Sequence, residues 1–579
     1  MNPISHICCF ENSTLVDVLN IYEIANNYSL PSGIALIIDT NTKSLLGTIT
    51  EGDMRRSLLV NNNLKISAFE VMNKNPIIFN ESSSISEIIN NLPIELLKRN
   101  RRSNKFLGKV VIVNDNNQPI RVLNYHELLE QRFALHRNIV ILGMGYVGLT
   151  LALVMADAGF TVTGVEVDES KYNKLNNGES YIHEQGLPEL LKEQINKNLS
   201  FSKEIPENSD VYIITVGTPI KNIDDSNKLP ELEFLSNSCF EIGKKIKQGN
   251  LVILRSTVPI GTSRNLVKTI LEEVSNLKCG FDFHLSFAPE RTAEGKAIKE
   301  LRSLPQIIGG FNKDSLEATA ALFRDLTPMI VKVDSLEAAE MAKLINNSFR
   351  DYVFAFSNQC AKIANEFNID IFKTIKAAND GYVRDPIPYP SPGVGGPCLT
   401  KDPFILASAA IKKDINGEIF KNSRLVNESM FSFVFEKIKL QVKNIGKDLN
   451  KCNILICGLA FKGYPETSDL RNSTAIEIAN IFKGKVNKLF GYDPIANDED
   501  IIQNGLIPVK IPEGFKNIDI VLFLNNHKNF EKINVFEMIR SMNDLPIVFD
   551  GWNIFYSEDI LSAKPSIYIG LSHLETSII

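Results

Sequence analysis

The sequence predicts an α/β protein in which two doubly wound parallel sheets are joined by a long helical segment and preceded by a smaller α+β unit. From Asn138 the pattern is an apolar strand, a glycine-rich turn, a helix and a second strand. A similar strand–helix series begins at Asn453, with NILICGLAF, KLFGYDP and DIVLFLNN as expected strands. Between them, residues 334–368 lack glycine and proline and carry apolar residues at helical spacing, which predicts one long helix. Wholly apolar strands that alternate with helices indicate parallel sheets covered on both faces.

Changes in this rhythm set the expected domain boundaries. At 579 residues the chain is too long for a single hydrophobic core. We expect a first unit over residues 1–134, a doubly wound domain over 135–330, a central helical domain over 331–445 and a second doubly wound domain over 446–579. The first unit contains the segments GIALIID, SLLGTITEGD and KVVIVNDNNQPIRVL and shows a weak internal repeat of roughly sixty residues.

Charge and hydropathy exclude several classes of partner. A net charge of −6 over this length argues against a nucleic acid or an anionic membrane as the main partner. The longest apolar segment, residues 138–160, is interrupted by four glycines and by Asp157, so it fits a strand, turn and helix better than a membrane span. The start, MNPISHICCFENS, lacks a basic stretch followed by an apolar run, so we expect no secretory signal and a cytoplasmic protein.

The turn after the first strand of this series has the glycine pattern of a dinucleotide site. Gly143 permits the tight turn, Gly145 lets the backbone approach a pyrophosphate, and Gly148 lets the helix pack on the strand. The helix N-terminus then offers free N–H groups to the phosphates. Glu166 ends the second strand, where it would accept the ribose hydroxyls and repel a 2′-phosphate, so NAD is favoured over NADP. The expected cofactor contacts include Tyr146 and Val147 of the same turn. The alternative is a glycine-rich turn that binds no ligand.

One of the eight cysteines lies in an unusual loop. The cysteines show no zinc-ligand spacing, we expect no metal site, and free thiols in a reducing compartment explain seven of them. Cys398 lies in PSPGVGGPCLTKD, residues 390–402, among three glycines and three prolines. The glycines permit close approach of a substrate carbonyl to a thiolate. From this loop alone, a catalytic cysteine and an ordinary thiol beside a surface pair of Lys401 and Asp402 remain equally open.

Further motifs occur in a fixed order along the chain. They are GMGYVGLT, VGTP, STVPIG, SFAPERTAEGKA (286–297), EAAEMAKLINNSF (337–349) and GLAFKGYPETSDLRNS (458–473). Together with the Cys398 loop they resemble the UDP-glucose/GDP-mannose dehydrogenase family over residues 138 to about 570. The resemblance implies an NAD-binding Rossmann domain, a central dimerisation domain and a C-terminal Rossmann-like domain for the UDP-sugar. It also implies oxidation of a sugar C6 alcohol to the carboxylate by two hydride transfers to NAD, in the synthesis of surface polysaccharide precursors.

The resemblance assigns a role to Cys398 and to residues on other segments. An aldehyde is oxidised most easily as a thiohemiacetal, whose collapse to a thioester releases hydride, and Cys398 matches the family nucleophile. Lys343 and Asn347 lie four residues apart on one helical face and match the pair that stabilises the alkoxide or oxyanion. Asp402, with Thr257 of STVPIG, matches the group that positions water for thioester hydrolysis.

Other residues match family positions around the two ligands. Glu294 matches the acid near the reacting carbon, and Glu290 matches a neighbouring acid. Lys462 of GLAFK and Arg471 of SDLRNS match groups that hold the uridine diphosphate. The remaining expected contacts are Thr218 and Thr257 with the cofactor, Gly395 with the substrate, and Arg384 with the site of a partner subunit.

Each of these residues has an ordinary alternative. Lys343 and Asn347 also suit a solvated helix face, the two glutamates suit a loop, and Lys462 and Arg471 suit a charged surface. A rival from a different class is a nucleotide-sensing protein that has lost its activity. The complete set of nucleophile, helix pair and acids argues against this rival, because decay removes such residues.

The acidic segment bears on the sugar. The UDP-glucose branch of the family reads PEFLxEG, whereas this chain reads PERTAEG, with Arg291 in place of an aromatic residue in the pocket wall. APER and GVGGPC are closer to the branch that oxidises UDP-N-acetylmannosamine or UDP-N-acetylglucosamine. We therefore expect a UDP-N-acetylhexosamine as substrate, with UDP-glucose as the alternative.

The first unit resembles a pair of CBS domains. LLGTITEGDMRRSLL (45–59) matches one repeat, and NPIIFNESSSISEII (75–89) matches the start of the second. Thr50 and Asp53 occupy the positions that contact the ribose and phosphate of an adenine nucleotide in that family, whereas the second repeat has Asn124 and Glu127 there. The resemblance implies a regulatory nucleotide site. A purely structural or dimerising unit is the alternative.

Overall fold

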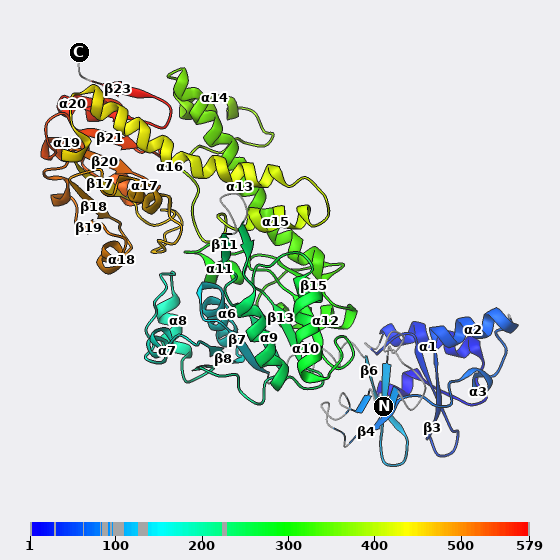
Figure 1. The fold of residues 1–579 in the computed structure, drawn as a ribbon. Coiled ribbons are helices and arrows are strands. Elements are labelled where there is room, and N and C mark those ends of the chain that lie inside the picture. The colour runs from blue at the N-terminus through cyan, green and yellow to red at the C-terminus, as the bar shows by residue number, and fades with distance from the viewer. Residues whose placement is uncertain are drawn as a thin grey trace. The chain divides into compact units, whose positions relative to one another are not determined.

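The computed structural model of the protein (Figure 1) describes residues 3–27, 30–61, 63–81, 83, 88, 91–92, 95–96, 109–124, 137–222 and 228–576. The chain forms two compact units, Met1–Arg137 and Asn138–Ile579. Glu127 and most of the segment from 82 to 108 lie outside the described residues. Among the helices in these ranges, none has the length and the apolar composition that a membrane crossing needs. The same ranges contain no group of three or more His, Cys, Asp and Glu side chains arranged to hold a metal ion.

The first unit contains two sheets with the same strand order and direction. In each sheet a parallel pair is followed by an antiparallel pair, and the antiparallel pair shifts register at Ile37/Ile38 in one sheet and at Ile112/Val113 in the other. The strands are β1 (Cys8–Phe10), β2 (Ile34–Ile38), β3 (Leu45–Thr50), β4 (Ile78–Asn80), β5 (Lys109–Val113) and β6 (Pro119–Asn124). Equivalent strands begin 70, 75 and 74 residues apart, so the repeat is longer than the expected sixty.

Helices complete the first repeat. The helical segments of this unit are η1 (Pro3–Ile7), α1 (Leu15–Asn27), α2 (Glu51–Asn61) and α3 (Ala68–Val71). Strands of both sheets share one hydrophobic core, in which Leu36 and Ile49 of the first sheet lie in the same cluster as Val111 and Val122 of the second. The two repeats therefore fold as one body.

The second unit begins with an eight-stranded sheet of strand order β16-β15-β14-β13-β10-β7-β8-β9, in which only the β14–β15 pair is antiparallel. Its strands are β7 (Asn138–Leu142), β8 (Thr161–Val165), β9 (Leu199–Ser202), β10 (Val211–Ile214), β13 (Leu251–Leu254), β14 (His284–Phe287), β15 (Gln306–Gly310) and β16 (Ile330–Val333). The strand order reverses between β7 and β10. In sheets of this kind, ligands bind beyond the carboxyl ends of the strands at that switch point.

Helices cover both faces of this sheet (Figure 1). They are α6 (Tyr146–Asp157), α7 (Glu169–Asn176), α8 (Leu187–Gln194), α9 (Glu233–Lys245), η3 (Ser263–Val267), α10 (Lys268–Ser275), α11 (Ala297–Leu301) and α12 (Lys313–Arg324). A hairpin of β11 (Ile220–Asn222) and β12 (Lys228–Pro230) projects beyond the sheet. The expected doubly wound domain is therefore present.

The central domain is helical. Helix α13 (Leu336–Glu366) is the predicted long helix, shorter by two residues at each end than its Gly- and Pro-free segment. It packs beside α16 (Glu418–Asn444) and α15 (Asp402–Ile411), with α14 (Ile371–Asn379) following it in the chain. Both long helices are visible as the link between the two sheets of this unit in Figure 1.

The C-terminal domain contains a seven-stranded sheet of order β19-β18-β17-β20-β21-β22-β23, parallel except at β22–β23. Its strands are β17 (Asn453–Cys457), β18 (Lys488–Tyr492), β19 (Ile507–Pro508), β20 (Ile520–Phe523), β21 (Ile547–Asp550), β22 (Ile567–Ile569) and β23 (Leu574–Thr576). Its helices are α17 (Thr474–Phe482), α18 (Asp498–Gln503), α19 (Val535–Ser541) and α20 (Ser557–Ala563), with short 3-10 turns η4 (Leu449–Lys451), η5 (Glu513–Phe515) and η6 (Lys528–Lys532).

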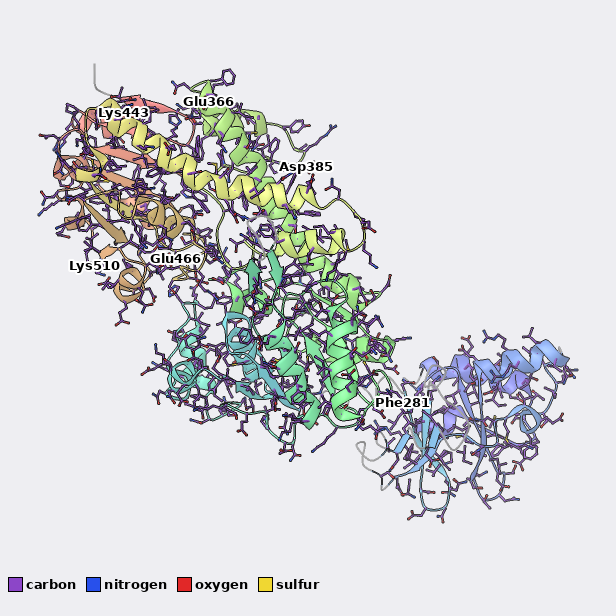
Figure 2. All side chains as sticks on the ribbon, in the orientation of Figure 1. Phe281, Glu366, Asp385, Lys443, Glu466 and Lys510 are labelled. Carbon is purple, nitrogen blue, oxygen red and sulfur yellow. The ribbon has the colours of Figure 1, made fainter. Side chains whose placement is uncertain are left out.

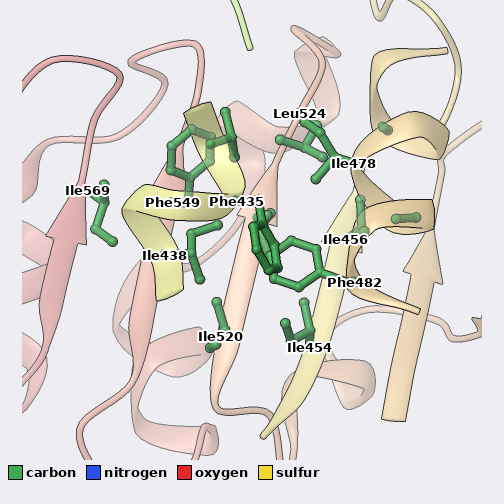
Figure 3. Packing of buried hydrophobic residues seen from close by; sticks show 14 of the residues in the cluster. Phe435, Ile438, Ile454, Ile456, Ile478, Phe482, Ile520, Leu524, Phe549 and Ile569 are labelled. Carbon is green, nitrogen blue, oxygen red and sulfur yellow. The ribbon is translucent and has the colours of Figure 1, made fainter. Parts of the chain in front are cut away.

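Strand side chains of this domain are buried on both faces. Along β17, Ile454 and Ile456 point to the core that α16 and α17 cover, whereas Leu455 and Cys457 point to the opposite core. Figure 3 shows the first core, where Phe435 of α16 and Phe482 of α17 meet above the strands. This burial explains why the strands are almost continuously apolar in sequence.

Replacing Phe482 by Ala is expected to lower the free energy of unfolding by about 3–5 kcal/mol, because a buried ring is lost and a cavity remains. Phe482 is fully buried and meets the ring of Phe435 edge-on, with ring centroids 5.0 Å apart. Urea unfolding followed by fluorescence of Trp552 reports on this domain, since the indole Nε1 donates to the Leu524 carbonyl at 3.0 Å.

The matched control for this measurement is Phe536→Ala on α19 of the same domain, where the ring is 42% exposed. We expect a change below about 1 kcal/mol, as for most surface substitutions. Equal losses for the two variants would contradict the packing described above.

Candidate active site

The turn between β7 and α6 has three glycines with different surroundings. Gly143 has a φ of +89°, a conformation that other residues rarely adopt. A Cβ at Gly148 would lie 1.9 Å from the Gly143 carbonyl oxygen, so the helix cannot approach the strand with a larger residue. A Cβ at Gly145 would meet nothing within 4 Å. The backbone at Gly145, which precedes α6, is therefore open to a ligand.

Glu166, directly after β8, holds this turn and keeps acceptor capacity. Its Oε2 accepts the Met144 N–H at 3.2 Å and its Oε1 accepts the Asp168 N–H at 3.0 Å. An ionised carboxylate has about four lone-pair sites, so roughly half of them remain for other donors. This capacity suits the hydroxyls of a ribose.

The equivalent acid of the C-terminal domain, Asp493, is fully engaged. Its four bonds come from the backbone N–H groups of Leu459, Ala460, Ile495 and Ala496, at 2.8–3.0 Å. Glu166 and Asp493 thus each hold the turn after the first strand of their domain. Of the two carboxylates, only Glu166 keeps free acceptor sites for a ribose. This difference favours a dinucleotide site beside Glu166, in the domain built on the eight-stranded sheet, over one beside Asp493.

Two loops beyond β10 and β13 are joined to the cysteine loop. The Thr218 hydroxyl donates to the Thr257 carbonyl at 2.6 Å. Lys401 Nζ donates to the Thr218 carbonyl at 3.2 Å and to its hydroxyl at 3.1 Å. Lys401, for which a surface ion pair was one of the open alternatives, therefore fastens the Cys398 loop to the loop that follows β10.

One face of α13 carries buried polar side chains toward these loops. Glu340, Lys343 and Asn347 follow one another at helical spacing and are each at most 8% exposed. Glu340 accepts the N–H groups of Gly261 at 2.5 Å and Ser263 at 2.8 Å, together with the Ser263 hydroxyl at 2.6 Å. The alternative of a solvated helix face is therefore wrong.

The predicted pair on this face reaches two different loops. Lys343 Nζ donates to the Glu290 carbonyl at 2.5 Å, and Asn347 Nδ2 donates to Asp402 Oδ2 at 2.6 Å. Burial raises the pKa of the Cys398 thiol and of the Asp402 carboxyl, and the charge of Lys343 opposes both shifts. Lys343 and Asn347 thus lie beside the predicted nucleophile and the predicted water-positioning acid.

The cysteine loop ends where α15 begins. Cys398 is exposed, and its carbonyl accepts the N–H groups of Lys401 at 3.1 Å and Asp402 at 3.0 Å. The protein groups around the sulfur exclude enough water to raise the thiol pKa, and Asp402 adds to the shift, whereas Lys343 and Lys401 oppose it. A reactive thiolate at this position depends on the two lysines.

Asp402 combines full burial with an open acceptor. Its Oδ1 is buried and has no hydrogen-bond partner within the described ranges. Burial raises the pKa of this carboxyl, opposed by Lys343, by Lys401 and by the amide of Asn347. An acceptor with a raised pKa, close to a nucleophile, suits the removal of a proton from water.

The glycines of this loop are crowded by the protein itself. A Cβ at Gly393 would lie 2.5 Å from the Phe431 ring, one at Gly395 would lie 2.4 Å from the Asn472 carbonyl, and one at Gly396 would lie 2.6 Å from the Phe461 ring. The interpretation that these glycines admit a substrate to Cys398 is therefore wrong for the side on which a side chain would project. They let the loop pack against α16 and the C-terminal domain.

A buried ion pair between α13 and α16 also holds the Cys398 loop in place. Arg424 of α16 and Asp351 of α13 are both fully buried, with Nη1 and Oδ1 2.6 Å apart. Arg424 also donates to the carbonyl of Val394 at 2.5 Å and to that of Leu399 at 3.3 Å, on either side of Cys398. Sequence reasoning missed both residues. A signal was present for Asp351 alone, because it continues the polar face of α13 one turn beyond Asn347.

The two acids of PERTAEG have different environments. The Glu290 carboxylate forms a buried ion pair with Arg255 and accepts the N–H groups of Arg291 and Thr292, each at 2.7 Å. Burial would raise its pKa, but Arg255 and these donors hold the pKa below the usual range. Its side chain holds the loop, and its backbone carbonyl receives Lys343.

Glu294 keeps a proton-exchanging carboxyl. Burial and the nearby Asp469 raise its pKa to about 7, whereas Arg471 and Lys462 oppose the shift. Thr467 donates its hydroxyl to Glu294 Oε2 at 3.2 Å, and Lys462 Nζ donates to the Glu294 carbonyl at 2.7 Å. Of the two acids, Glu294 is the one able to exchange a proton near neutral pH.

Three further arginines that the sequence singled out differ in their surroundings. Arg471 is exposed, and its Nε and Nη2 bind both oxygens of Asp469 at 2.5–2.9 Å. Arg291 donates to the Pro305 carbonyl at 2.5 Å, so it ties down its loop. Arg384 lies on an exposed segment beside Asp385, which Figure 2 labels, and the described structure gives it no bond to the Cys398 group.

Comparison with known families matches this chain in three consecutive parts. The matching models describe the NAD binding domain, the central domain and the UDP binding domain of the UDP-glucose/GDP-mannose dehydrogenase family, over residues 137–327, 337–429 and 455–557. The matched residues thus begin at the boundary of the second unit.

Individual relatives match this chain over about 400 residues. A UDP-N-acetyl-D-mannosamine dehydrogenase of Pyrococcus horikoshii is 31% identical over 421 residues, covering 72% of this chain and 96% of that protein. One of Campylobacter jejuni is 32% identical over 406 residues, covering 68% of this chain and 97% of that protein. The solved structure of UDP-D-ManNAc dehydrogenase from Pyrococcus horikoshii has a TM-score of 0.68 at 29% identity, covering 75% of this chain and 99% of that one.

Replacing Lys343 by Met is expected to raise the pKa of the Cys398 thiol, because the nearby ammonium stabilises the thiolate. The rate of Cys398 alkylation by iodoacetamide, followed against pH by peptide mass spectrometry, measures this. We expect the midpoint of the rate profile to move upward by roughly one pH unit.

Lys362→Met, on the same helix, is the matched control, since Lys362 binds the Ser429 hydroxyl at 3.1 Å and does not act on Cys398. A midpoint that moves downward, or one that moves equally in both variants, would contradict the assigned role of Lys343.

Proposed function

The chain belongs to the UDP-glucose/GDP-mannose dehydrogenase family, and we propose that it oxidises the C6 alcohol of a UDP-N-acetylhexosamine to the carboxylate with two NAD. It is an NAD-dependent UDP-sugar dehydrogenase by its family. The observation that carries the proposal is the convergence of Cys398, Lys343, Asn347 and Asp402 between the two sheets. The relatives' names support an N-acetylhexosamine rather than glucose.

The residues divide the reaction between them. Bound NAD supplies the hydride acceptor in both oxidations. Lys343 and Asn347 donate to the oxygen on C6, stabilising the alkoxide of the first step and the oxyanion of the later ones. The Cys398 thiolate adds to the aldehyde carbon to give a thiohemiacetal oxyanion, which collapses to a thioester as its C6 hydrogen leaves as hydride. Water then attacks the thioester, Asp402 takes a proton from it through its open Oδ1, and the thiolate leaves as the carboxylic acid forms.

Glu294 supplies a second proton-exchanging group near the reacting carbon. With a pKa of about 7, it is protonated below neutral pH and ionised above it. Lys462, which binds the Glu294 carbonyl, and the exposed Arg471 provide cationic groups for the uridine diphosphate.

A substrate panel with full-length protein tests the proposal directly. We expect UDP-N-acetylmannosamine or UDP-N-acetylglucosamine to be oxidised faster than UDP-glucose or GDP-mannose, with two NADH formed per sugar. Absorbance at the NADH band and mass spectrometry of the sugar nucleotide give the stoichiometry. One NADH per sugar, or a preference for GDP-mannose, would contradict the mechanism. No turnover with any sugar would favour the inactive nucleotide sensor.

Cys398→Ser is expected to lower carboxylate output by several orders of magnitude.

We propose that the enzyme is a dimer in which a second copy covers α13. Exposed apolar side chains recur at helical spacing along this helix, whereas its buried face carries the charged and amide groups described above together with small and apolar residues. The exposed apolar residues are Met341, Ile345, Phe349, Tyr352, Phe356 and Ile363 on the helix and Phe367 at its C-terminal cap. An apolar stripe of this length on a surface helix is typical of an interface. A partner subunit would also give a role to Arg384, which forms no hydrogen bond or ion pair among the described residues.

Phe349→Asp is expected to convert the dimer to a monomer, since it places a charge in the middle of the stripe, where Phe349 is 64% exposed. Size-exclusion chromatography with light scattering measures the mass. Phe240→Asp on α9, where the ring is 47% exposed, is the matched control and is expected to leave the mass unchanged. A monomeric wild-type protein would reject the dimer.

We propose that the first unit is a CBS-type module that binds an adenine nucleotide at Thr50 and Asp53. Its support is the duplicated sheet arrangement and the resemblance of residues 45–59. The Thr50 N–H and hydroxyl donate to Asp53 Oδ2 at 2.9 and 2.7 Å, and Arg56 binds the other oxygen at 2.5 Å. This arrangement caps α2, as a purely structural module also requires.

Calorimetry of the full chain with AMP and ATP separates the two alternatives. We expect binding that weakens at least about tenfold in Asp53→Asn, as expected when a hydrogen bond to a charged group is lost. Asp17→Asn is the matched control, because Thr14 and Asp17 cap α1 with the same geometry, at 2.8 and 2.9 Å. Absence of heat with either nucleotide would leave the scaffold alternative.

A further inference from the structure

The carboxylate of Glu184 is buried where the dinucleotide turn meets the PERTAEG loop. It lies between α7 and α8 and is 3% exposed. Its Oε2 accepts the hydroxyl of Tyr146, the first residue of α6, and the N–H of Gly295 at 2.6 Å. The Gly295 N–H also lies 3.0 Å from the Tyr146 hydroxyl oxygen. The dinucleotide turn and the PERTAEG loop are thus tied through one side chain.

The PERTAEG loop is in turn pressed against the C-terminal domain. Gly295 has a φ of +84°, and a Cβ there would lie 2.3 Å from the Glu466 carbonyl oxygen. Figure 2 shows Glu466 at the edge of that domain which faces the domain of the eight-stranded sheet. Beside this contact, Lys462 and Thr467 bind Glu294 at 2.7 and 3.2 Å. A continuous chain of contacts therefore runs from Tyr146 to the domain that holds the nucleotide sugar.

We propose that Glu184 is a positioning residue that couples binding of the dinucleotide to binding of the UDP-sugar; the inference rests on the proposed function for the identity of the two ligands. A buried carboxylate is stable only while its donors are in place. Displacing either the Tyr146 turn or the Gly295 loop removes one of the two donors to Oε2. The other oxygen, Oε1, has no partner within the described ranges and cannot compensate.

Each ligand therefore favours the same arrangement. A dinucleotide on the turn holds Tyr146, which keeps Glu184 and Gly295 in place. A nucleotide sugar held by Lys462 and Glu294 fixes the PERTAEG loop from the other side. Two ligands that stabilise one common state bind with positive cooperativity, and the coupling is equal in both directions.

Tyr181 provides a control on the same turn. Its hydroxyl donates to the carbonyl of Met144, between Gly143 and Gly145, and has no bond to Gly295 among the described residues. A variant at Tyr181 therefore disturbs the cofactor turn without breaking the connection through Glu184.

The test measures NADH affinity by fluorescence, with and without saturating UDP, in the full-length protein. For the wild type we expect UDP to tighten NADH binding at least about fivefold, and NADH to tighten UDP binding by the same factor. In Tyr146→Phe and in Glu184→Gln we expect the factor to fall close to one. Tyr181→Phe is expected to keep the wild-type factor even if its NADH affinity is lower.

The outcomes separate this inference from the proposed function. If NADH or UDP does not bind the wild type, the proposed function fails. If both bind but without coupling, or if coupling persists in Tyr146→Phe and Glu184→Gln, the inference about Glu184 is wrong. Loss of coupling in Tyr181→Phe as well would show a general effect of the turn and would also overturn it. Tyr146→Phe removes a single oxygen, so it gives a decisive result should Glu184→Gln fail to fold.

Discussion

Helix α13 buries a row of charged and amide side chains, and each of them binds a different part of the site. Glu340 binds the loop after β13, and Lys343 binds the PERTAEG loop. Asn347 binds Asp402, and Asp351 pairs with Arg424, which donates to two carbonyls of the Cys398 loop. The relative positions of the proposed nucleophile, acid and oxyanion donors thus follow from the geometry of one helix. A rigid element with fixed spacing is a precise way to place groups that come from two domains.

Buried charges of this kind also destabilise other conformations of the site. An ion pair removed from water is stabilising only when it is complete, and losing one partner leaves the other at a cost of about 3–5 kcal/mol. The loops of the site therefore cannot rearrange one at a time without exposing or orphaning a charge on α13. The same reasoning links the dinucleotide turn to the C-terminal domain through Glu184.

The sequence predicted the elements well and their mutual contacts poorly. The bounds of α13, the strand β17 and the glycine turn followed from local periodicity, which depends on neighbours in the chain. The crowding of Gly395 by Asn472 did not, because it joins residues far apart in sequence. The sequence interpretation assigned that space to a substrate. Arg424 gave no local signal either, since a charge within an amphipathic helix ordinarily faces water. The duplication in the first unit was visible, but its spacing was not, because insertions between strands hide the period.

Hydrogen exchange of the Cys398 loop tests most directly whether the polar face of α13 positions the site. The measurement compares the wild type with Asp351→Asn, which leaves Arg424 buried without its carboxylate. If the polar face positions the site, residues 391–402 exchange faster in Asp351→Asn, with unchanged protection in the strands of the eight-stranded sheet. Unchanged exchange over 391–402 would show that the loop is held by other contacts and would contradict the account.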